Sequence, residues 1–180
     1  MADVGGDFTV TMPELRAVAR FVAESAAEVL EIFESAVPGD DRPREAIAAA
    51  RAFVEGAPRS RRQRVAAVDA HRAAAQAPTE PARLAARCAG DAAAAAYLHP
   101  IARASQVGHI LRAAATVAHL SELSADVDQG AAARSLERSR LRATQGLVDV
   151  LRRYPSASSP VGGSRVATLM AELDAALRQH

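Results

Sequence analysis

The sequence contains no lysine and no tryptophan, and its only cysteine is Cys88. A lone cysteine excludes an internal disulfide and fits the reducing cytoplasm, which is the location we expect. Aromatic residues are only 3% of the chain, so the side chains that favour β-strands are scarce. No apolar run reaches the length of about 18 residues that a membrane-spanning helix needs, and no signal peptide is evident at the start. We therefore expect no membrane association.

Alanine makes up about a quarter of the 180 residues. It has the highest intrinsic helix propensity because it loses no side-chain entropy on entering a helix, so the composition predicts an all-α fold. Each buried alanine removes little apolar area from water, at about 25 cal/mol per Å². Larger apolar residues or a subunit interface must supply the remaining stability, which leaves a homo-oligomer open.

The charges nearly cancel, with 22 basic and 21 acidic residues and a formal net charge of +1. This balance gives no overall attraction to phosphate or to anionic lipid, so a nucleic-acid partner is not expected. All of the basic residues are arginine. Codon bias in a GC-rich genome is the simplest explanation of that choice.

The chain is organised as a short N-terminal tail over residues 1–10 and a single helical domain over 11–180. Two capping boxes, Thr11 with Glu14 and Ser60 with Gln63, mark helix starts. Apolar residues then recur at three- and four-residue steps, as they do on the buried face of a helix. The pattern predicts a bundle of about seven helices with an alanine-rich core, over residues 11–36, 41–55, 60–76, 80–98, 100–123, 131–154 and 166–177.

No catalytic constellation is evident in the sequence. It lacks a nucleophile elbow, a phosphate-binding glycine loop and a metal-binding helix motif. His99, His109 and His119 are spaced ten residues apart, which places them on different faces of a straight helix. We therefore expect a protein that is not an enzyme, with no cofactor and no metal.

Two kinds of polar residue remain to be explained. The cluster Arg61, Arg62 and Arg64 opens a predicted helix, where positive charge opposes the helix dipole. It is either a solvated helix start or a surface that contacts an acidic partner or, as a third alternative, nucleic-acid phosphate. The second kind is a set of polar residues at helix entrances and among alanines, which form either a structural hydrogen-bond network or a polar pocket. These candidate binding residues are Asp41, Arg42, Arg44, His71, Asp91, Tyr97, His99, Gln106 and His109.

Over about residues 30–123 the sequence resembles the immunity-five-like family of small, helical bacterial immunity proteins. The most individual match is Tyr97-Leu98-His99-Pro100. The other matching residues are Asp41-Arg42-Pro43-Arg44, Ile47, Ala50-Arg51, Ala70-His71, Ala86-Arg87, Gly90, Gln106-Val107 and His109-Ile110-Leu111. The sequence departs from the family pattern at Asp91, where many members carry histidine, and at Arg112, where a small residue is common. The resemblance implies an antidote-like role, in which the protein binds a toxin and blocks its activity.

The sequence thus favours a non-enzymatic protein that binds a partner protein through a helical surface. Arginine is a favoured residue at the centre of such interfaces, which makes Arg42, Arg44, Arg61 and Arg62 the first candidates. The alternative is a helical domain that binds a small molecule or a metal. In that alternative, Asp41, Arg42, Arg44, His71, His99 and His109 would surround a shared cavity.

Overall fold

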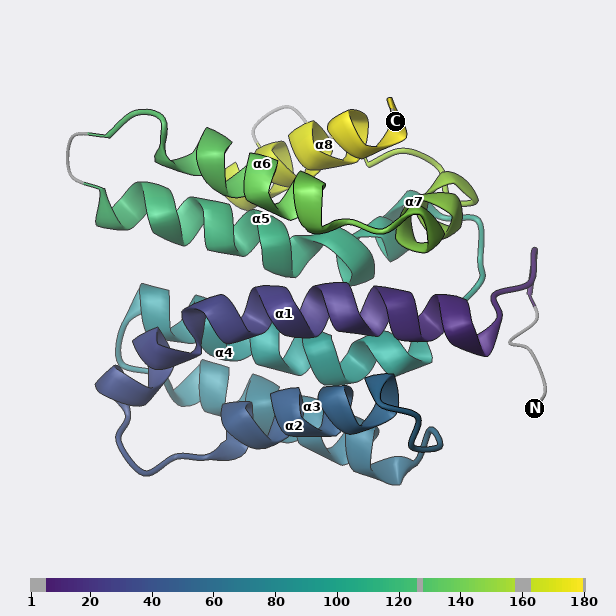
Figure 1. The fold of residues 1–180 in the computed structure, drawn as a ribbon. Helices are drawn as coiled ribbons and strands as arrows, with labels where there is room; N and C mark the ends of the chain where they lie inside the picture. Colours follow the sequence, from purple (N-terminus) through teal and green to yellow (C-terminus); the bar gives the residue numbers. More distant parts are fainter. Residues whose placement is uncertain (1–5, 126–127, 158–162, 180) are drawn as a thin grey trace.

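Helices account for all of the regular secondary structure in the computed structural model, which describes residues 6–125, 128–157 and 163–179 (Figure 1). The all-α prediction is confirmed for these residues, with eight α-helices where about seven were expected. Two short 3₁₀ helices, η1 (Ala95–Tyr97) and η2 (Ala104–Gln106), lie between α4 and α5. The α-helices are α1 (Met12–Ala36), α2 (Arg42–Val54), α3 (Arg61–Gln76), α4 (Glu80–Ala94), α5 (Val107–Ser124), α6 (Ala131–Arg142), α7 (Gln145–Arg152) and α8 (Arg165–Arg178).

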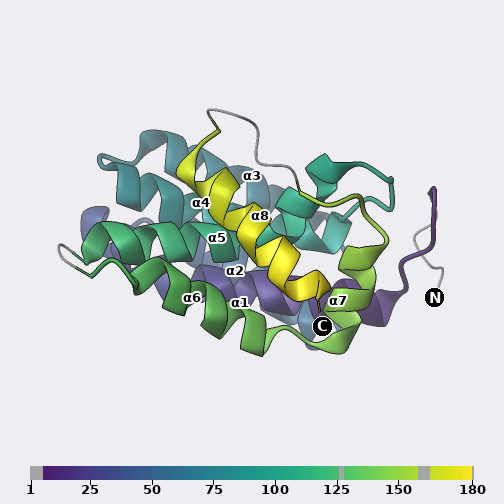
Figure 2. The same cartoon turned by 90° about the horizontal axis from the view of Figure 1, so that it is seen from above.

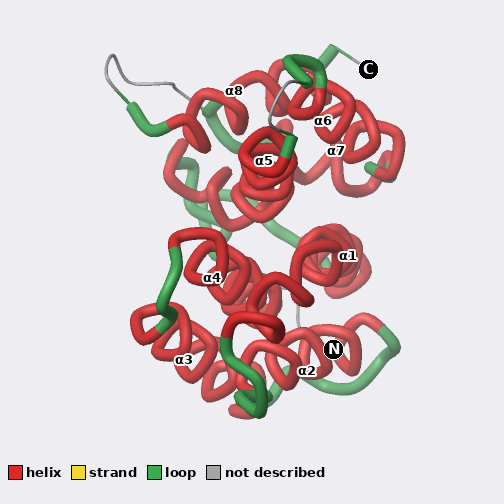
Figure 3. The backbone as a smooth tube through the Cα atoms, turned by 90° about the vertical axis from the view of Figure 1, so that its left-hand side faces the viewer, coloured by secondary structure: helices red, strands yellow, loops and turns green. Residues whose placement is uncertain are grey.

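The helices stack in layers around α1 and α4, which lie side by side in the middle of the molecule (Figure 3). Helices α2 and α3 pack against one side of this pair, and α5 packs against the other side. Helices α6 and α8 then cover the outer side of α5, with α8 lying across it when the molecule is seen from above (Figure 2). The chain segment from α4 to α5 therefore leads from the central pair to the α5 side.

Alanine lines the contacts between the inner helices. On α4, Ala82, Ala85, Ala89 and Ala92 are all fully buried. Small side chains let helix backbones approach closely. The close-packed interior then makes many dispersion contacts, which add to the small stabilisation from burying alanine's own apolar area. The larger side chains fill the space between the layers. These fully buried residues include Leu15, Phe33, Phe53, Ile110, Leu111, Leu147, Leu151 and Tyr154.

Both predicted capping boxes are present. The Thr11 hydroxyl accepts from the Glu14 amide at 3.4 Å, and the Glu14 carboxylate accepts from the Thr11 amide at 2.8 Å. Ser60 and Gln63 form the second box at the start of α3. Asp41 occupies the N-cap position of α2, as predicted, but its side chain makes no capping hydrogen bond. Asp40, one residue earlier on the loop, instead accepts from the Arg42 amide at 3.2 Å.

The fifth helix begins later than the sequence pattern predicted, at Val107 rather than at Pro100. The intervening residues are held as a loop against the N-terminal segment. The Pro100 carbonyl accepts from the Asp7 amide at 2.9 Å, and the Asp7 carboxylate accepts from the Ala102 amide at 2.8 Å. These long-range bonds satisfy backbone groups that a helix would otherwise have paired, and they leave His99 outside any helix.

The predicted helix over 131–154 is divided into α6 and α7. Ala143 adopts an extended conformation, and the Thr144 hydroxyl accepts from the Leu147 amide at 3.3 Å, which makes Thr144 a new N-cap. Threonine favours this role over an interior helical position because its side chain competes for nearby backbone groups. The break turns α7 toward the start of α1.

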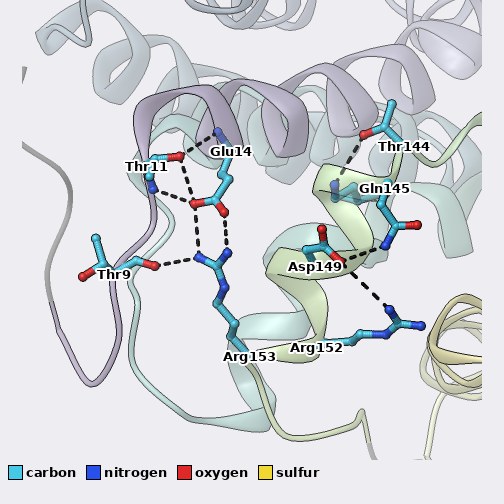
Figure 4. A network of polar contacts seen from close by, with 9 residues as sticks. Thr9, Thr11, Glu14, Thr144, Gln145, Asp149, Arg152 and Arg153 are labelled. Atoms are coloured by element: carbon cyan, nitrogen blue, oxygen red, sulfur yellow. Dashed lines mark hydrogen bonds and ion pairs between the residues drawn. The ribbon is translucent and has the colours of Figure 1, made fainter.

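A polar network ties the end of α7 to the start of α1 (Figure 4). The Arg153 guanidinium contacts both oxygens of Glu14, and its Nη1 donates to the Thr9 carbonyl at 2.7 Å. The same Glu14 carboxylate completes the capping box of α1. The network therefore joins residues far apart in the sequence at the edge of the bundle, close to the loop that carries His99.

Candidate functional site

A buried carboxylate connects three helices at the centre of the candidate site. Asp91 on α4 is only 3% exposed, and both of its oxygens accept from Arg112 on α5, at 2.8 Å and 2.6 Å. The Nε2 of His71 on α3 lies 3.9 Å from the same carboxylate. Asp91 is thus compensated by a bidentate cation, as a buried charge requires.

The imidazole of His71 lies directly over Gly90 on α4. A Cβ atom on Gly90 would come within 2.6 to 2.8 Å of three atoms of that ring. The missing side chain is therefore what admits the ring to this position, next to Asp91. Sequence analysis placed Gly90 among the family-like residues, and the structure supplies a physical reason for glycine there.

Both histidines near this carboxylate favour the neutral form. Burial lowers the pKa of His71 below its ordinary 6.5, more than the attraction of Asp91 raises it. Burial, with the Arg112 charge, likewise lowers the pKa of His109. Burial also raises the pKa of the Cys88 thiol to about 12, so Cys88 is a protonated thiol at neutral pH and not a nucleophile.

Four of the predicted binding residues line one cavity. We call it the imidazole pocket, and its volume is about 470 Å³. It lies where α3, the end of α4 and the start of α5 meet, beside the 95–106 connection. The pocket is lined by Arg64, Ala67, Val68, Ala94, Tyr97, Leu98, His99, Gln106 and His109.

The aromatic wall of the imidazole pocket is fixed by its neighbours. The Tyr97 hydroxyl donates to the Ser60 carbonyl at 2.7 Å. The guanidinium carbons of Arg64 and Arg59 lie 4.3 Å and 5.1 Å from the centre of the Tyr97 ring, at cation–π distance. The start of α3 is therefore held against η1, and this contact places the Arg64 charge at the pocket.

The backbone of His99 is anchored from the far end of the chain. Its carbonyl accepts from the buried Tyr154 hydroxyl at 2.9 Å. The Tyr154 ring in turn meets the Phe8 ring edge-on, with ring centres 4.9 Å apart. A side chain that follows α7 thus helps to position a residue of the imidazole pocket.

The predicted arginine cluster lies on the solvent-facing side of α3. Two apolar residues, Val65 and Val68, stand among these arginines and are 45% and 49% exposed. Within the described residues, no acidic side chain lies within ion-pair distance of Arg61 or Arg62, whereas Arg72 contacts Asp69 at 3.1 Å. We call this set the α3 surface, and it consists of Arg61, Arg62, Arg64, Val65, Val68 and Arg72.

The Asp41-Arg42-Pro43-Arg44 motif does not reach the imidazole pocket. Arg42 is paired with Asp40 at 2.6 Å, and Arg44 is paired with Glu34 at 2.6 Å. Neither these arginines nor Asp41 is among the residues that line the imidazole pocket. Arg42 instead borders another part of the α3 side, where it shares a shallow cavity of about 140 Å³ with Arg62.

Sequence reasoning missed three contributors to this region. It treated Arg112 only as a departure from a family pattern, although this residue is the partner of Asp91. It also passed over Val65 and Val68. Their three-residue spacing, on a helix whose buried side is marked by Ala67 and Ala70, was a signal for a second apolar stripe.

The histidines do not gather into a metal site within the described residues. No group of three or more histidine, cysteine, aspartate or glutamate side chains there is placed to hold a metal ion. Among the described residues, no helix is both long enough and apolar enough to span a lipid bilayer.

Comparison with known proteins yields one match. A family model described as Imm-5 like putative immunity protein matches residues 10–122, which run from the residue before the Thr11 cap nearly to the end of α5. No curated protein and no solved structure matches the chain. The matched region contains the imidazole pocket and the α3 surface, while α6, α7 and α8 lie beyond it.

Proposed function

The chain belongs to the Imm-5 like putative immunity protein family, and from this premise we propose that it binds a partner toxin protein and blocks its activity. In this proposal the protein acts in the bacterial cytoplasm by occupying the toxin, without catalysing a reaction. The docking site is the α3 surface, and the partner presents acidic groups to it.

The observation that carries this proposal is the combination of exposed valines and arginines on α3. Many arginines elsewhere, such as Arg83 and Arg165, lie in ion pairs with neighbouring carboxylates. Arg61 and Arg62 have no such partner among the described residues, although they stand in the first turn of a helix, where their charge opposes the dipole. An acidic partner would offset that cost, and Val65 and Val68 would provide apolar contact between the charges.

This arrangement resembles a protein interface more closely than an ordinary solvated helix. Interfaces place apolar residues at the centre and polar residues at the rim, and arginine is enriched among the residues that contribute most to binding. Steering by complementary charge also speeds encounter, which suits a protein that must reach a toxin before the toxin acts.

Co-expression with the product of the neighbouring gene tests the proposal. We expect that product to arrest growth when expressed alone, and we expect growth to be restored when this protein is present. The two purified proteins should then elute together as one complex in size-exclusion chromatography. Growth arrest that persists despite equal expression of this protein, with no complex formed, would overturn the proposed function.

A further inference from the structure

We propose that the imidazole pocket is the anchor site of the same docking face, and that it takes an apolar side chain of the partner with a carboxylate beside it. This inference rests on the proposed function, because the occupant is a segment of the partner protein. Three observations support it, namely the walls of the pocket, its charges and its continuity with the α3 surface.

The walls of the pocket are mainly apolar. Ala67 and Val68 from α3, Ala94 from α4 and Leu98 beyond η1 contribute hydrocarbon surface, and the Tyr97 ring adds an aromatic face. A volume of about 470 Å³ accommodates an aromatic or a branched aliphatic side chain. Burial of such a group is the usual source of affinity at the centre of an interface.

The ionisable groups of the pocket favour an anion. Arg64 carries a positive charge, the His109 imidazole can gain one, and no carboxylate is among the lining residues. Asp91, whose charge acts on His109, is already bound at both oxygens by Arg112. The lining therefore offers a carboxylate the Arg64 cation and no opposing carboxylate, whereas the Arg64 charge would repel an ammonium group.

The pocket opens onto the α3 surface without a break. Arg64 and Val68 belong to both, since they also line the shallow groove along α3. The other residues of this groove are Arg61, Val65, Asp69 and Arg72, and Asp69 is paired with Arg72. A partner segment lying on this groove would reach the pocket directly. One continuous occupant then explains both the exposed valines and the cavity beside them.

Binding of a carboxylate should be linked to proton uptake at His109. The groups that face this imidazole are Arg112 on its own helix, Asp91 on α4, His71 and Arg64 on α3, and Tyr97 and His99 on the connection. In the free protein, burial and the surrounding positive charge lower the His109 pKa. A bound carboxylate raises it, so the occupied pocket takes up a proton and affinity increases as the pH falls toward the lowered His109 pKa of the free protein.

The test uses the full chain and N-acetyl-phenylalanine, an aromatic group with an adjacent carboxylate, followed by NMR of the histidine rings. We expect saturable shifts of His99 and His109 with a Kd on the order of 1 mM, the affinity of a ligand of this size with ordinary efficiency. The neutral probe N-acetyl-phenylalanine amide should bind about tenfold more weakly. Equal binding of the two probes, or no saturable shift, would overturn the inference.

Two variants with the same kind of substitution locate the site. Val68→Asp places a carboxylate at the mouth of the pocket, at an exposed position. It should weaken binding of the acidic probe by at least about tenfold. Leu141→Asp, at a 69% exposed position of α6, is the matched control and should bind the probe as the wild type does. Equal loss in both variants would contradict the assignment of the site.

The same variants separate this inference from the proposed function. If V68D no longer binds the probe and no longer protects toxin-expressing cells, while L141D does both, the partner uses the pocket. If V68D loses the probe but protects cells as well as the wild type does, the pocket inference is overturned and the proposed function stands. If the wild type binds the probe but never protects cells, the proposed function and the inference that rests on it both fail.

Discussion

Arg112 on α5 binds both carboxylate oxygens of Asp91 on α4, and this bidentate pair joins the two helices that flank the imidazole pocket. The Asp91 carboxylate is therefore neutralised by the Arg112 guanidinium. The pair also explains how a charge can lie among the alanines of α4.

Arg112→Ala should destabilise the protein because it leaves the buried Asp91 carboxylate without a cation. Removing one partner of a buried pair typically costs about 3 to 5 kcal/mol, and the partial exposure of Arg112 places this case near the lower figure. Urea denaturation at neutral pH measures the change. The double variant D91A/R112A should regain most of the loss, since it removes the uncompensated charge. A double variant no more stable than R112A would show that the pair acts through packing.

Gly90→Ala should act mainly through His71. Alanine is favoured over glycine inside a helix by about 1 kcal/mol, but its Cβ would meet the His71 ring. We expect G90A to stabilise the H71A variant by about that amount and to stabilise the wild type by clearly less. Thermal or urea unfolding of the four proteins in this cycle provides the measurement. Equal effects in both backgrounds would mean that the ring is not confined by Gly90.

Glu14 should make the stability of the protein depend on acid pH. The contacts with Arg153 lower the Glu14 pKa from 4.5 to about 2, so the folded state favours the carboxylate. The resulting stabilisation is complete above the unfolded pKa of 4.5 and is lost as the pH falls toward about 2. After discounting for solvent screening it amounts to about 1 to 2 kcal/mol.

The variant Glu14→Gln should therefore be less stable than the wild type at pH 7, and the difference should vanish as the pH falls to about 2. Glu31→Gln, on an exposed position of the same helix, controls for the loss of one carboxylate. Urea midpoints measured across the acid range follow the difference. A gap between E14Q and wild type that stays constant with pH would exclude the ion pair as its cause.

Tyr154→Phe should loosen the His99 loop from a distance. It removes the hydroxyl that donates to the His99 carbonyl at 2.9 Å and leaves that carbonyl without this partner. The expected cost is about 1 kcal/mol, with faster amide hydrogen exchange in the loop after His99. Exchange measured by mass spectrometry should show the change at the loop and not in α2. Unchanged exchange at the loop would mean that the Asp7 contacts alone hold it.

The sequence sufficed for the features that depend on local chemistry. Capping boxes at Thr11 and Ser60 predicted helix starts correctly, because the residues that satisfy the terminal amides lie within one turn. The predicted start of α5 at Pro100 was wrong. The residues after Pro100 form a loop instead, because they pair with Asp7, which is far away in the sequence. Such long-range partners leave no periodic signal in the chain.

The candidate site was predictable in part for the same reason. Tyr97, His99, Gln106 and His109 are close in sequence, and they also lie together in the imidazole pocket. The motif beginning at Asp41 was expected to join a shared cavity in one hypothesis, yet its arginines pair locally with Asp40 and Glu34. Which residues meet across helices depends on how those helices pack, and the alanine faces of this chain do not distinguish one arrangement from another.

Charge reversal on the α3 surface tests most directly whether this surface binds the partner. The variant R61E/R62E and the control R20E/R138E carry the same change in net charge, and all four arginines are exposed. Binding of the purified toxin would be measured by calorimetry at equal ionic strength. We predict that R61E/R62E weakens binding by at least about a hundredfold, while R20E/R138E stays within about threefold of the wild type. Equal affinities of the two double variants would contradict the claim.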